Sequence, residues 1–419
     1  MQQMTTLEEL RSSKWCVLVV SGLAVFTDMV IYAVVMPILK EILDPMNEKS
    51  ATSKSIVSAS YAVGLFIFTP VFGILSDRYH NRKIPMLIGQ AGLAISTLLF
   101  AFSSSFAALL LARSLQGIAG AATWVVGMAM LSDVFAGPRL GFYMSIVFTC
   151  HTAGFMLGPL IGGFLHDHYG LRAPFYICAG LSIVDFLGRM WIKEPKQKNL
   201  KKGISIVKLF RCPEVILACT AIMMKSASYS SVETLLEQHL FDSFGYTPST
   251  VSLIFMSFIL PGILSSVFFG YLCGVVQRHL VIAISLAVHP FASLLIGSES
   301  SIVCIVLGGL LFGTSAAGIG TPVSPELSDI VDSYGGASYA QVFAILNIFY
   351  SLGLLYGPVL TAGITERYGF GNGLICLNYS MVIFSPIFYF LMQKLYPKRI
   401  ARAQLLKHGL LCDDEKAGV

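Results

Sequence analysis

The chain has 419 residues, of which 55% are hydrophobic and only 12% are charged, and its mean hydropathy is +0.74. A soluble domain usually carries about 25% charged residues, so this chain lacks the charge needed to cover a surface that faces water. The same numbers exclude intrinsic disorder, a coiled coil and nucleic-acid binding. The sequence therefore predicts a polytopic membrane protein, in which the placement of the basic residues matters more than the net charge of +5.

Apolar stretches long enough to span a bilayer recur along the whole chain. A hydrocarbon core of about 30 Å needs about 20 helical residues. The first stretch, from Trp15 to Leu39, is too long for the core of a signal peptide and predicts a spanning helix. We predict twelve transmembrane helices, at residues 15–39, 55–76, 84–103, 107–131, 139–165, 173–192, 215–240, 248–273, 280–297, 302–325, 338–364 and 373–396.

The distribution of Lys and Arg predicts the orientation of these helices. If the N-terminus is cytoplasmic, the inner loops and both tails hold 20 of the 28 basic residues. Three more, Arg113, Arg189 and Lys225, lie inside predicted spans. Both termini are therefore predicted to lie in the cytoplasm. The outer loops hold the other 5 basic residues, Lys40, Lys49, Lys54, Arg172 and Arg367.

An internal repeat divides the chain into two halves. The sequence Phe72-Gly73-Ile-Leu has an echo at Phe269-Gly270-Tyr-Leu, 197 residues later. We predict an N-terminal six-helix half at 1–192, a basic cytoplasmic linker at 193–213, a C-terminal six-helix half at 214–396 and a cytoplasmic tail at 397–419. Two parallel halves of this kind are an architecture of secondary transporters. Five residues of span 5 recur 199 residues later in span 11: Gly154, Gly158, Pro159, Tyr169 and Gly170 return as Gly353, Gly357, Pro358, Tyr368 and Gly369.

Three stretches in the first half carry charged residues at unusual positions, glycines suited to close helix packing, or both. The stretch after span 2 places a glycine that packs the helix end closely before an acid and a basic cluster, which can hold two helix bundles together in one conformation. The alternative is a positive-inside anchor alone. Span 4 carries Arg113 in an apolar helix, and span 5 combines a GxxxG face with a proline. The residues of the first and third stretches are Gly73, Asp77, Arg78, Arg82 and Lys83, and Gly154, Gly158, Pro159, Gly162 and Gly163.

In order and spacing these stretches resemble the signatures of the major facilitator superfamily, and the span-5 element resembles the antiporter motif of its twelve-span drug:proton branch. The resemblance implies an all-helical fold of twelve spans in two pseudo-symmetric halves. It departs from the family pattern at Asn81, where glycine is usual, and at Gly274, which stands in place of the acid in the second copy.

The chain also resembles the vesicular monoamine transporters. Asp28 precedes Pro37 by nine residues as in that family, 102–117 is similar to its span 3–4 stretch, and Asp185 and Glu233 fall at acidic positions of the family. Two differences concern the substrate and the coupling rather than the fold. Tyr61 stands where a lysine is expected, and Asn347 stands where an aspartate is expected.

Buried ionisable residues are the candidate coupling groups. Each costs about 2.5–3.5 kcal/mol at membrane depth and so usually has a function. The predicted buried set contains three acids and two bases, so at least one carboxylate lacks a cationic partner and tends to be protonated. Such a group binds either a proton or a cationic substrate, which is the basis of antiport. The five residues are Asp28, Arg113, Asp185, Lys225 and Glu233.

Asp28 and Glu233, one in each half, are expected to face the central cavity, with Asp28 contacting a substrate amine and Glu233 carrying the proton. The two roles are exchangeable, and Asp28 as a structural partner of Arg113 is an alternative. Lys225 either balances Asp185 or selects anionic groups, although a structural role for Asp185 is favoured. Glu237 replaces Glu233 if the span is shifted by one turn.

Other polar and aromatic residues complete the expected site. The run His166-Asp167-His168 is expected to be a solvated outer loop, and no metal site or cofactor is predicted. Aromatic faces suit cationic or flat apolar ligands. The residues expected to line the cavity are Tyr32, Tyr61, Trp124, Tyr229, Asn347 and Tyr350.

These observations predict a proton-coupled antiporter that exports or sequesters a small organic compound such as a drug, toxin, amine or secondary metabolite. The alternatives are a nutrient uniporter or symporter of the same fold and, from another class, a membrane receptor or scaffold. No nucleophile constellation or GxxxxGK[ST] motif occurs, so neither an enzyme nor an ATP-driven pump is expected. A monomer in the plasma membrane or a vesicle or vacuole membrane is expected, with protons, substrate and lipid as its partners.

Overall fold

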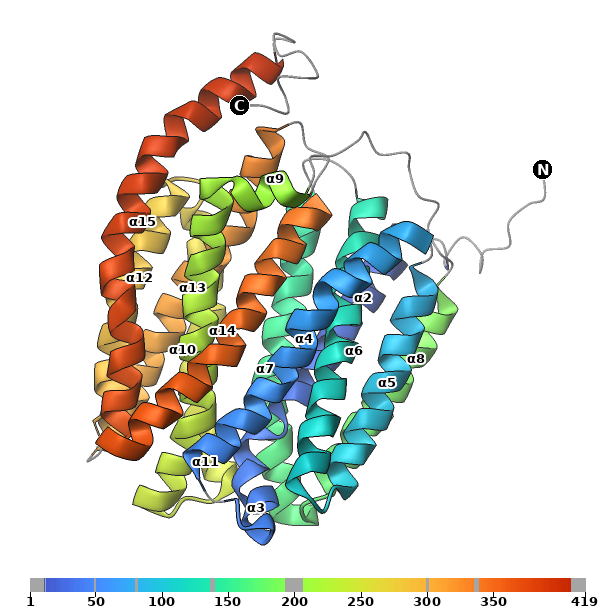
Figure 1. Ribbon diagram of the computed structural model, residues 1–419, viewed down its shortest axis with the longest axis vertical. Helices are drawn as coiled ribbons and strands as arrows, with labels where there is room; N and C mark the ends of the chain where they lie inside the picture. The colour runs from blue at the N-terminus through green and yellow to red at the C-terminus, as the bar shows by residue number, and fades with distance from the viewer. Residues whose placement is uncertain are drawn as a thin grey trace, which may run out of the picture.

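The computed structural model describes residues 11, 13–48, 50–79, 82–135, 140–192, 206–298, 301–334 and 339–407, and these residues form helices and short connections without a strand. Most of the predicted linker 193–213 and the end of the tail 397–419 lie outside the described residues, as do the side chains of Asp77 and Arg78. The long helices form one bundle, from which α15 projects at the end where α9 lies (Figure 1).

Within the residues that the structure describes, six long helices belong to the first half and six more to the second. The first comprises α2 (Lys14–Ala33), η1 (Met36–Ile38), α3 (Leu39–Leu43), η2 (Asp44–Met46), α4 (Ala51–Tyr79), α5 (Lys83–Phe102), α6 (Phe106–Val134), α7 (Leu140–Tyr169) and α8 (Ala173–Trp191). After α9 (Ile206–Arg211), the second comprises α10 (Pro213–Phe244), α11 (Pro248–Leu272), α12 (Arg278–Ile296), α13 (Ile302–Asp332), α14 (Tyr339–Tyr368) and α15 (Phe370–Lys407).

The predicted all-helical membrane fold is confirmed. Within the described ranges, 11 helices are long and apolar enough to cross a membrane, and α7, with 30 residues, packs beside α2 and α11 in the same bundle. The predicted spans match these helices closely with three exceptions. The first predicted span, 15–39, is not one helix, because α2 ends at Ala33 and η1 follows. In the second half, α13 continues past residue 325 to Asp332 and α15 continues past residue 396 to Lys407. The prolines at 322 and 325 did not end α13.

The halves pack in equivalent ways. In the first half α2 packs on α7 and α4 on α6; in the second α10 packs on α14 and α11 on α13. Between the halves, α4 packs on α14 and α7 packs on α11. Because spans 2 and 5 correspond to spans 8 and 11 in the repeat, these two interfaces are equivalent to each other. The two halves therefore share a pseudo-symmetric interface.

The repeated Tyr-Gly pair marks the end of a helix in each half. Gly170 follows α7 with φ +85°, and Gly369 follows α14 with φ +89°. Glycine adopts this left-handed conformation without the steric cost that other residues incur, and it commonly ends a helix in this way. The amide of each glycine donates a 2.9 Å hydrogen bond to the carbonyl four residues earlier. The repeat at a spacing of 199 residues therefore includes the glycine that ends each helix as well as the glycines within the helix.

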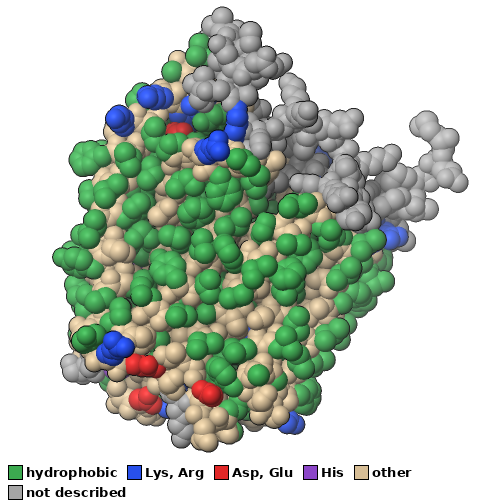
Figure 2. All heavy atoms as spheres, viewed as in Figure 1, with side chains coloured by type: hydrophobic (Ala, Val, Ile, Leu, Met, Phe, Trp, Pro, Cys, Tyr) green, Lys and Arg blue, Asp and Glu red, His purple; other side chains and the backbone are tan. Residues whose placement is uncertain are grey.

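The surface of the bundle fits a lipid environment. Figure 2 shows hydrophobic side chains across the middle of the visible face, with Lys, Arg, Asp and Glu near its two ends. Large apolar side chains such as Ile67, Val267 and Phe390 are more than half exposed. Exposed apolar surface on this scale is favourable in a hydrocarbon layer and unfavourable in water. The protein is thus a multi-pass membrane protein.

A close helix crossing in the first half lies between α4 and α6. A Cβ added at Gly117 would lie 1.9 Å from the carbonyl oxygen of Tyr61, and one added at Gly64 would lie 2.3 Å from that of Ser114. At Gly73 the nearest atom, on Val125, would lie 3.8 Å away, which is an ordinary contact. The expectation of close packing at Gly73 is therefore wrong.

These two glycines give a matched pair of substitutions. Gly117→Ala is expected to destabilise the protein by about 1–3 kcal/mol, because the added methyl group overlaps backbone atoms that have no room to move. Gly73→Ala is expected to leave stability unchanged or to raise it by up to about 1 kcal/mol, because alanine favours the helix. Thermal unfolding of both variants in detergent measures the difference. Equal melting temperatures would contradict the crossing geometry.

Candidate functional site

Asp28 lies in the middle of the bundle on α2, and its side chain is fully buried. The hydroxyl of Tyr61 on α4 donates a 3.2 Å hydrogen bond to its Oδ2 atom, whereas its Oδ1 atom has no hydrogen-bond partner. Gly120 on α6 leaves room for this pair, because a Cβ there would lie 2.6 Å from the Tyr61 hydroxyl and 3.1 Å from Oδ2. The site therefore holds a carboxyl group with one vacant acceptor.

Arg113 on α6 is fully buried beside these residues. Its guanidinium donates to Gln116 Oε1 at 2.9 Å and to the Tyr32 carbonyl at 2.8 Å. The guanidinium carbon also lies 4.6 Å from the centre of the Tyr32 ring and 5.4 Å from that of Tyr61. Arg113 makes no ion pair with Asp28 among the described residues, so the alternative of a direct structural pair is not observed.

Glu233 occupies the facing position on α10, in the second half, and its side chain is 3% exposed. The Tyr32 hydroxyl donates a 3.5 Å hydrogen bond to its Oε2 atom across the interface, and its Oε1 atom has no partner. The rings of Tyr32 and Tyr61 lie 4.6 Å apart. Two tyrosines therefore connect the carboxyl group of one half with that of the other.

A small cavity adjoins Glu233 between the halves. Its volume is about 10 Å³, which is close to the minimum that holds one water molecule. The walls are mainly aromatic, and the rings of Phe155 and Tyr229 lie 5.0 Å apart across the interface. The lining residues are Phe155, Pro159, Tyr229, Val232, Glu233, Phe255, Phe258, Ile259 and Phe312.

Glu237, the alternative to Glu233, lies one helical turn further along α10. It is buried and forms an ion pair with the buried Lys54 of α4, with 3.2 Å between Nζ and Oε2. The structure thus places both glutamates at the interface, but among the described residues only Glu237 has a cationic partner there. Lys54 was expected in an outer loop. Ser50 is the sequence signal that α4 begins before Lys54. Its hydroxyl accepts a hydrogen bond from the Ser53 amide at the first turn of the helix.

Asp185 and Arg189, one turn apart on α8, form a buried ion pair with 2.7 Å between Arg189 Nη2 and Asp185 Oδ2. The structural role favoured for Asp185 agrees with this pair, and the alternative that Lys225 balances Asp185 is wrong. Arg189 also belongs to the buried set, so the count of three acids against two bases is wrong. Four groups remain, Asp28, Arg113, Lys225 and Glu233, with two charges of each sign.

Lys225 lies on α10 two turns before Glu233. It makes neither a hydrogen bond nor an ion pair with any residue in the described part of the chain. Its Nζ atom lies against Gly320 of α13, where an added Cβ would be 3.0 Å away.

Two other predicted cavity residues contact the imidazole of His151: the centre of the Tyr350 ring is 6.1 Å from that of His151, and the centre of the Trp124 ring is 5.1 Å from it. Asn347 instead donates a 3.0 Å hydrogen bond to Thr69 across the α4–α14 interface.

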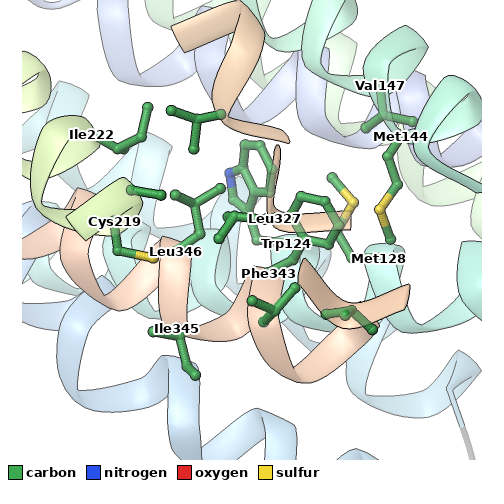
Figure 3. Close-up of a cluster of buried hydrophobic side chains, with 14 of the residues drawn as sticks. Trp124, Met128, Met144, Val147, Cys219, Ile222, Leu327, Phe343, Ile345 and Leu346 are labelled. Carbon is green, nitrogen blue, oxygen red and sulfur yellow. The ribbon is translucent and has the colours of Figure 1, made fainter. Parts of the chain in front are cut away.

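The interface is closed at both ends. At the end of the bundle that carries α3, called the α3 end, the Lys54–Glu237 pair is joined by a 2.6 Å ion pair between Lys40 and Asp242. At the opposite end, called the α9 end, side chains of both halves share one buried apolar cluster. Figure 3 shows Trp124, Met128, Met144 and Val147 of the first half with Ile222, Leu327, Phe343 and Leu346 of the second.

The glycine motif of α7 brings this helix against α2. A Cβ at Gly154, Gly158 or Gly162 would lie within 2.7 Å of atoms of α2 or of the residue that follows it, and one at Gly163 would lie 2.4 Å from Ser252 of α11. The equivalent Gly357 meets Ala227 of α10 at 2.4 Å, and Pro358 follows it in α14. Pro159 reaches across the halves, because its carbonyl accepts a 2.8 Å hydrogen bond from Ser252.

The two described basic residues after α4 lie against the first half. Lys83 donates two 2.8 Å hydrogen bonds to the carbonyls of Met190 and Ile192 at the end of α8, and Arg82 is 7% exposed. The run His166-Asp167-His168 lies in the last turns of α7, so the expectation of a loop there is wrong. Asp167 accepts a 3.1 Å hydrogen bond from the Ser249 amide of α11.

Comparison with solved structures shows the same fold in transporters. A bacterial homolog of the human lysosomal transporter Spinster, in an inward-facing and unoccupied conformation, has a TM-score of 0.73 at 15% identity and covers 92% of this chain and 98% of its own. The human organic anion transporter MFSD10 has a TM-score of 0.67 at 17% identity, over 90% of this chain and 99% of its own.

Sequence comparison identifies relatives that align with most of the chain. The mouse synaptic vesicular amine transporter is 27% identical over 360 residues, which cover 83% of this chain and 67% of that protein. The vesicular acetylcholine transporter of Drosophila melanogaster is 25% identical over 413 residues, or 88% of this chain and 70% of that protein. The model of the Major Facilitator Superfamily matches residues 18–358 and, in a second match, 218–407. The chain therefore belongs to the Major Facilitator Superfamily and is a membrane transporter of that family.

Proposed function

We propose that the protein is a proton-coupled antiporter that moves a small organic compound with a cationic group away from the cytosol. The observation that carries this proposal is the pair formed by Asp28 and Glu233. Each is buried at the interface of the two halves, each has one carboxyl oxygen without a partner, and neither forms an ion pair within the described residues. Burying a carboxylate without a counter-ion is costly, so each group favours either a proton or a cationic cargo.

The exchange follows from this competition. A protonated carboxyl group is neutral and tolerates burial, whereas the ionised group attracts a cation. Asp28 contacts the amine of the cargo and Glu233 carries the proton. Tyr32 and Tyr61 connect the two sites, and Arg113 is positioned over both rings. Alternate opening of the α3 end and the α9 end then releases the proton on one side and the cargo on the other.

The charge distribution along the chain supports the orientation. We propose that the α9 end and both termini face the cytosol, because the inner loops and tails of that arrangement hold 20 of the 28 basic residues. The proposed halves, 1–192 and 214–396, act as the two rocking bodies of a monomer.

The vesicular amine and acetylcholine transporters among the relatives support a cargo with a cationic nitrogen. The proposed location is a vesicle, vacuole or plasma membrane.

The test uses purified protein in proteoliposomes with an imposed pH gradient and a panel of organic cations. At least one compound is expected to drive proton movement in the wild-type protein. Asp28→Asn is expected to lower the affinity for that compound at least tenfold, whereas Asp44→Asn, in the short helix outside the bundle, leaves it unchanged. Transport that ignores the pH gradient and survives Asp28→Asn would refute the proposal.

A further inference from the structure

Lys225 is a cation at the interface that the proton–amine exchange leaves without a role. Its side chain is half-buried on α10 and contacts Gly320 of α13 through its terminal nitrogen. No carboxylate, carbonyl or hydroxyl in the described residues accepts a hydrogen bond from it. The nearby titratable groups are the imidazoles of His151 and His289, and His289 is already bonded to Ser228 and Ser315 at 2.9 and 2.8 Å.

The face of α10 arranges the charged groups along one line. Lys225, Tyr229, Glu233 and Glu237 follow one another at intervals of four residues, which places them on the same side of the helix. Glu237 is paired with Lys54 at the α3 end. Between Glu233 and Lys225 lies the Tyr229 ring, 5.7 Å from Phe312 of α13. This face of α10 therefore has an acidic end at Glu233 and Glu237, an aromatic middle at Tyr229 and a basic end at Lys225.

The positive and negative charges at the interface are equal in number only when Lys225 is counted together with the acidic residues. With the Asp185–Arg189 pair and the Lys54–Glu237 pair each neutral, the two acids Asp28 and Glu233 and the two bases Arg113 and Lys225 remain. Arg113 is held by Gln116, the Tyr32 carbonyl and two aromatic rings. A cargo with a single positive charge would satisfy a carboxylate and leave the half-buried Lys225 without an anion, which is unfavourable for a partly desolvated charge.

We propose that Lys225 binds an anionic group of the cargo, so that the substrate class is a zwitterion with an amine at one end and a carboxylate at the other. This inference rests on the proposed function for the amine end only. Lys225 and Glu233 are eight residues apart, or ~12 Å along the helix axis. The two charges of the cargo therefore lie at opposite ends of an aromatic body rather than on one carbon atom. The amine contacts Asp28, which Tyr61 and Tyr32 connect with Glu233, and the carboxylate faces the α9 end.

The experiment compares two probes that differ only at the carboxylate: 4-(2-aminoethyl)benzoic acid and its methyl ester, which keeps the amine but loses the negative charge. Equilibrium binding to the full chain is measured by calorimetry in detergent, without a pH gradient. The acid is expected to bind at least tenfold more tightly than the ester. Lys225→Gln is expected to remove this preference while leaving the affinity for the ester unchanged, and Lys225→Arg is expected to retain part of it.

The controls separate this inference from folding and from proton coupling. Lys208→Gln, on the exposed α9, serves as a matched neutral substitution that leaves the preference intact. Size-exclusion chromatography and melting temperature check that each variant is folded. Tyrosine carries its amine and its carboxylate on one carbon, and its preference over tyrosine methyl ester is expected to be smaller than that of the benzoic acid over its ester. Equal or tighter binding of the benzoate ester by the wild type, equal weakening of both probes in Lys225→Gln, or binding of neither probe would overturn the inference.

Binding of the acid through Lys225 without proton movement in proteoliposomes would instead refute the antiport mechanism and leave the zwitterion site standing. Proton-coupled transport of amines with no effect of Lys225→Gln on charge preference would refute the zwitterion site and leave the antiporter standing.

Discussion

Replacing Glu233 with glutamine is expected to abolish pH-driven accumulation of the cargo while preserving exchange of cargo for cargo. The amide keeps the shape of the side chain and an acceptor for the Tyr32 hydroxyl, which lies 3.5 Å from Oε2, but it does not bind a transported proton. One pH unit is worth about 1.4 kcal/mol per proton, so the wild type gains about tenfold accumulation per unit for each proton exchanged. In Glu233→Gln this ratio falls to one.

Radiolabelled cargo uptake in proteoliposomes, with and without a pH gradient, measures both activities on the same preparation. Glu233→Asp is the matched control, because it keeps a carboxyl group on the same turn of α10 and is expected to retain part of the accumulation. Full accumulation in Glu233→Gln would assign the proton to Asp28 and exchange the proposed roles. Loss of exchange as well as accumulation would make Glu233 a cargo ligand instead.

Removing one partner of the Lys54–Glu237 pair is expected to open the α3 end. Both side chains are buried, and Lys54→Met leaves the Glu237 carboxylate without its cation in the interior. Breaking a buried ion pair in this way costs about 3–5 kcal/mol. Since 1.4 kcal/mol corresponds to a factor of ten, the closed form loses at least about 100-fold in population relative to the open one.

The double variant Lys54→Met with Glu237→Met provides the control. Replacing both ions with apolar side chains of similar volume is often neutral or stabilising, so the double variant is expected to recover most of the closed population. Reaction of a cysteine introduced at Ser58 with a membrane-impermeant thiol reagent, in a background without native cysteines, measures the opening. If the single and double variants react equally fast, the pair does not hold this end closed.

The sequence was sufficient for the helices because membrane-spanning segments depend on local hydrophobicity. Twenty apolar residues form a helix in lipid whatever their neighbours are, since every backbone polar group must be satisfied within the segment. The repeat around Gly158 and Gly357 was visible for a similar reason, because close backbone contact admits only small residues. Asp28 and Glu233 were found because charge is rare at membrane depth.

Partnerships between distant residues were not predictable in the same way. The ion pair between Lys54 and Glu237 depends on how two helices from different halves meet, and no local pattern encodes that distance. The close packing expected at Gly73 was wrong for the same reason, since no local pattern shows how near the neighbouring helix lies to a given glycine. Asp185 and Arg189 are one turn apart, and the pairing of residues at that spacing would have corrected the count of buried charges.

The two ends of the interface are held by different kinds of force, and this difference links transport to temperature. The α3 end is fastened by ions, whereas the cluster around Trp124 and Phe343 at the α9 end is apolar. Apolar association weakens on cooling, and the cost of desolvating ions falls on heating. Cooling therefore weakens the apolar contacts that close the α9 end, and warming favours the ion pairs that close the α3 end. The population of carriers open at each end then depends on temperature, in addition to the slowing of every transport step on cooling.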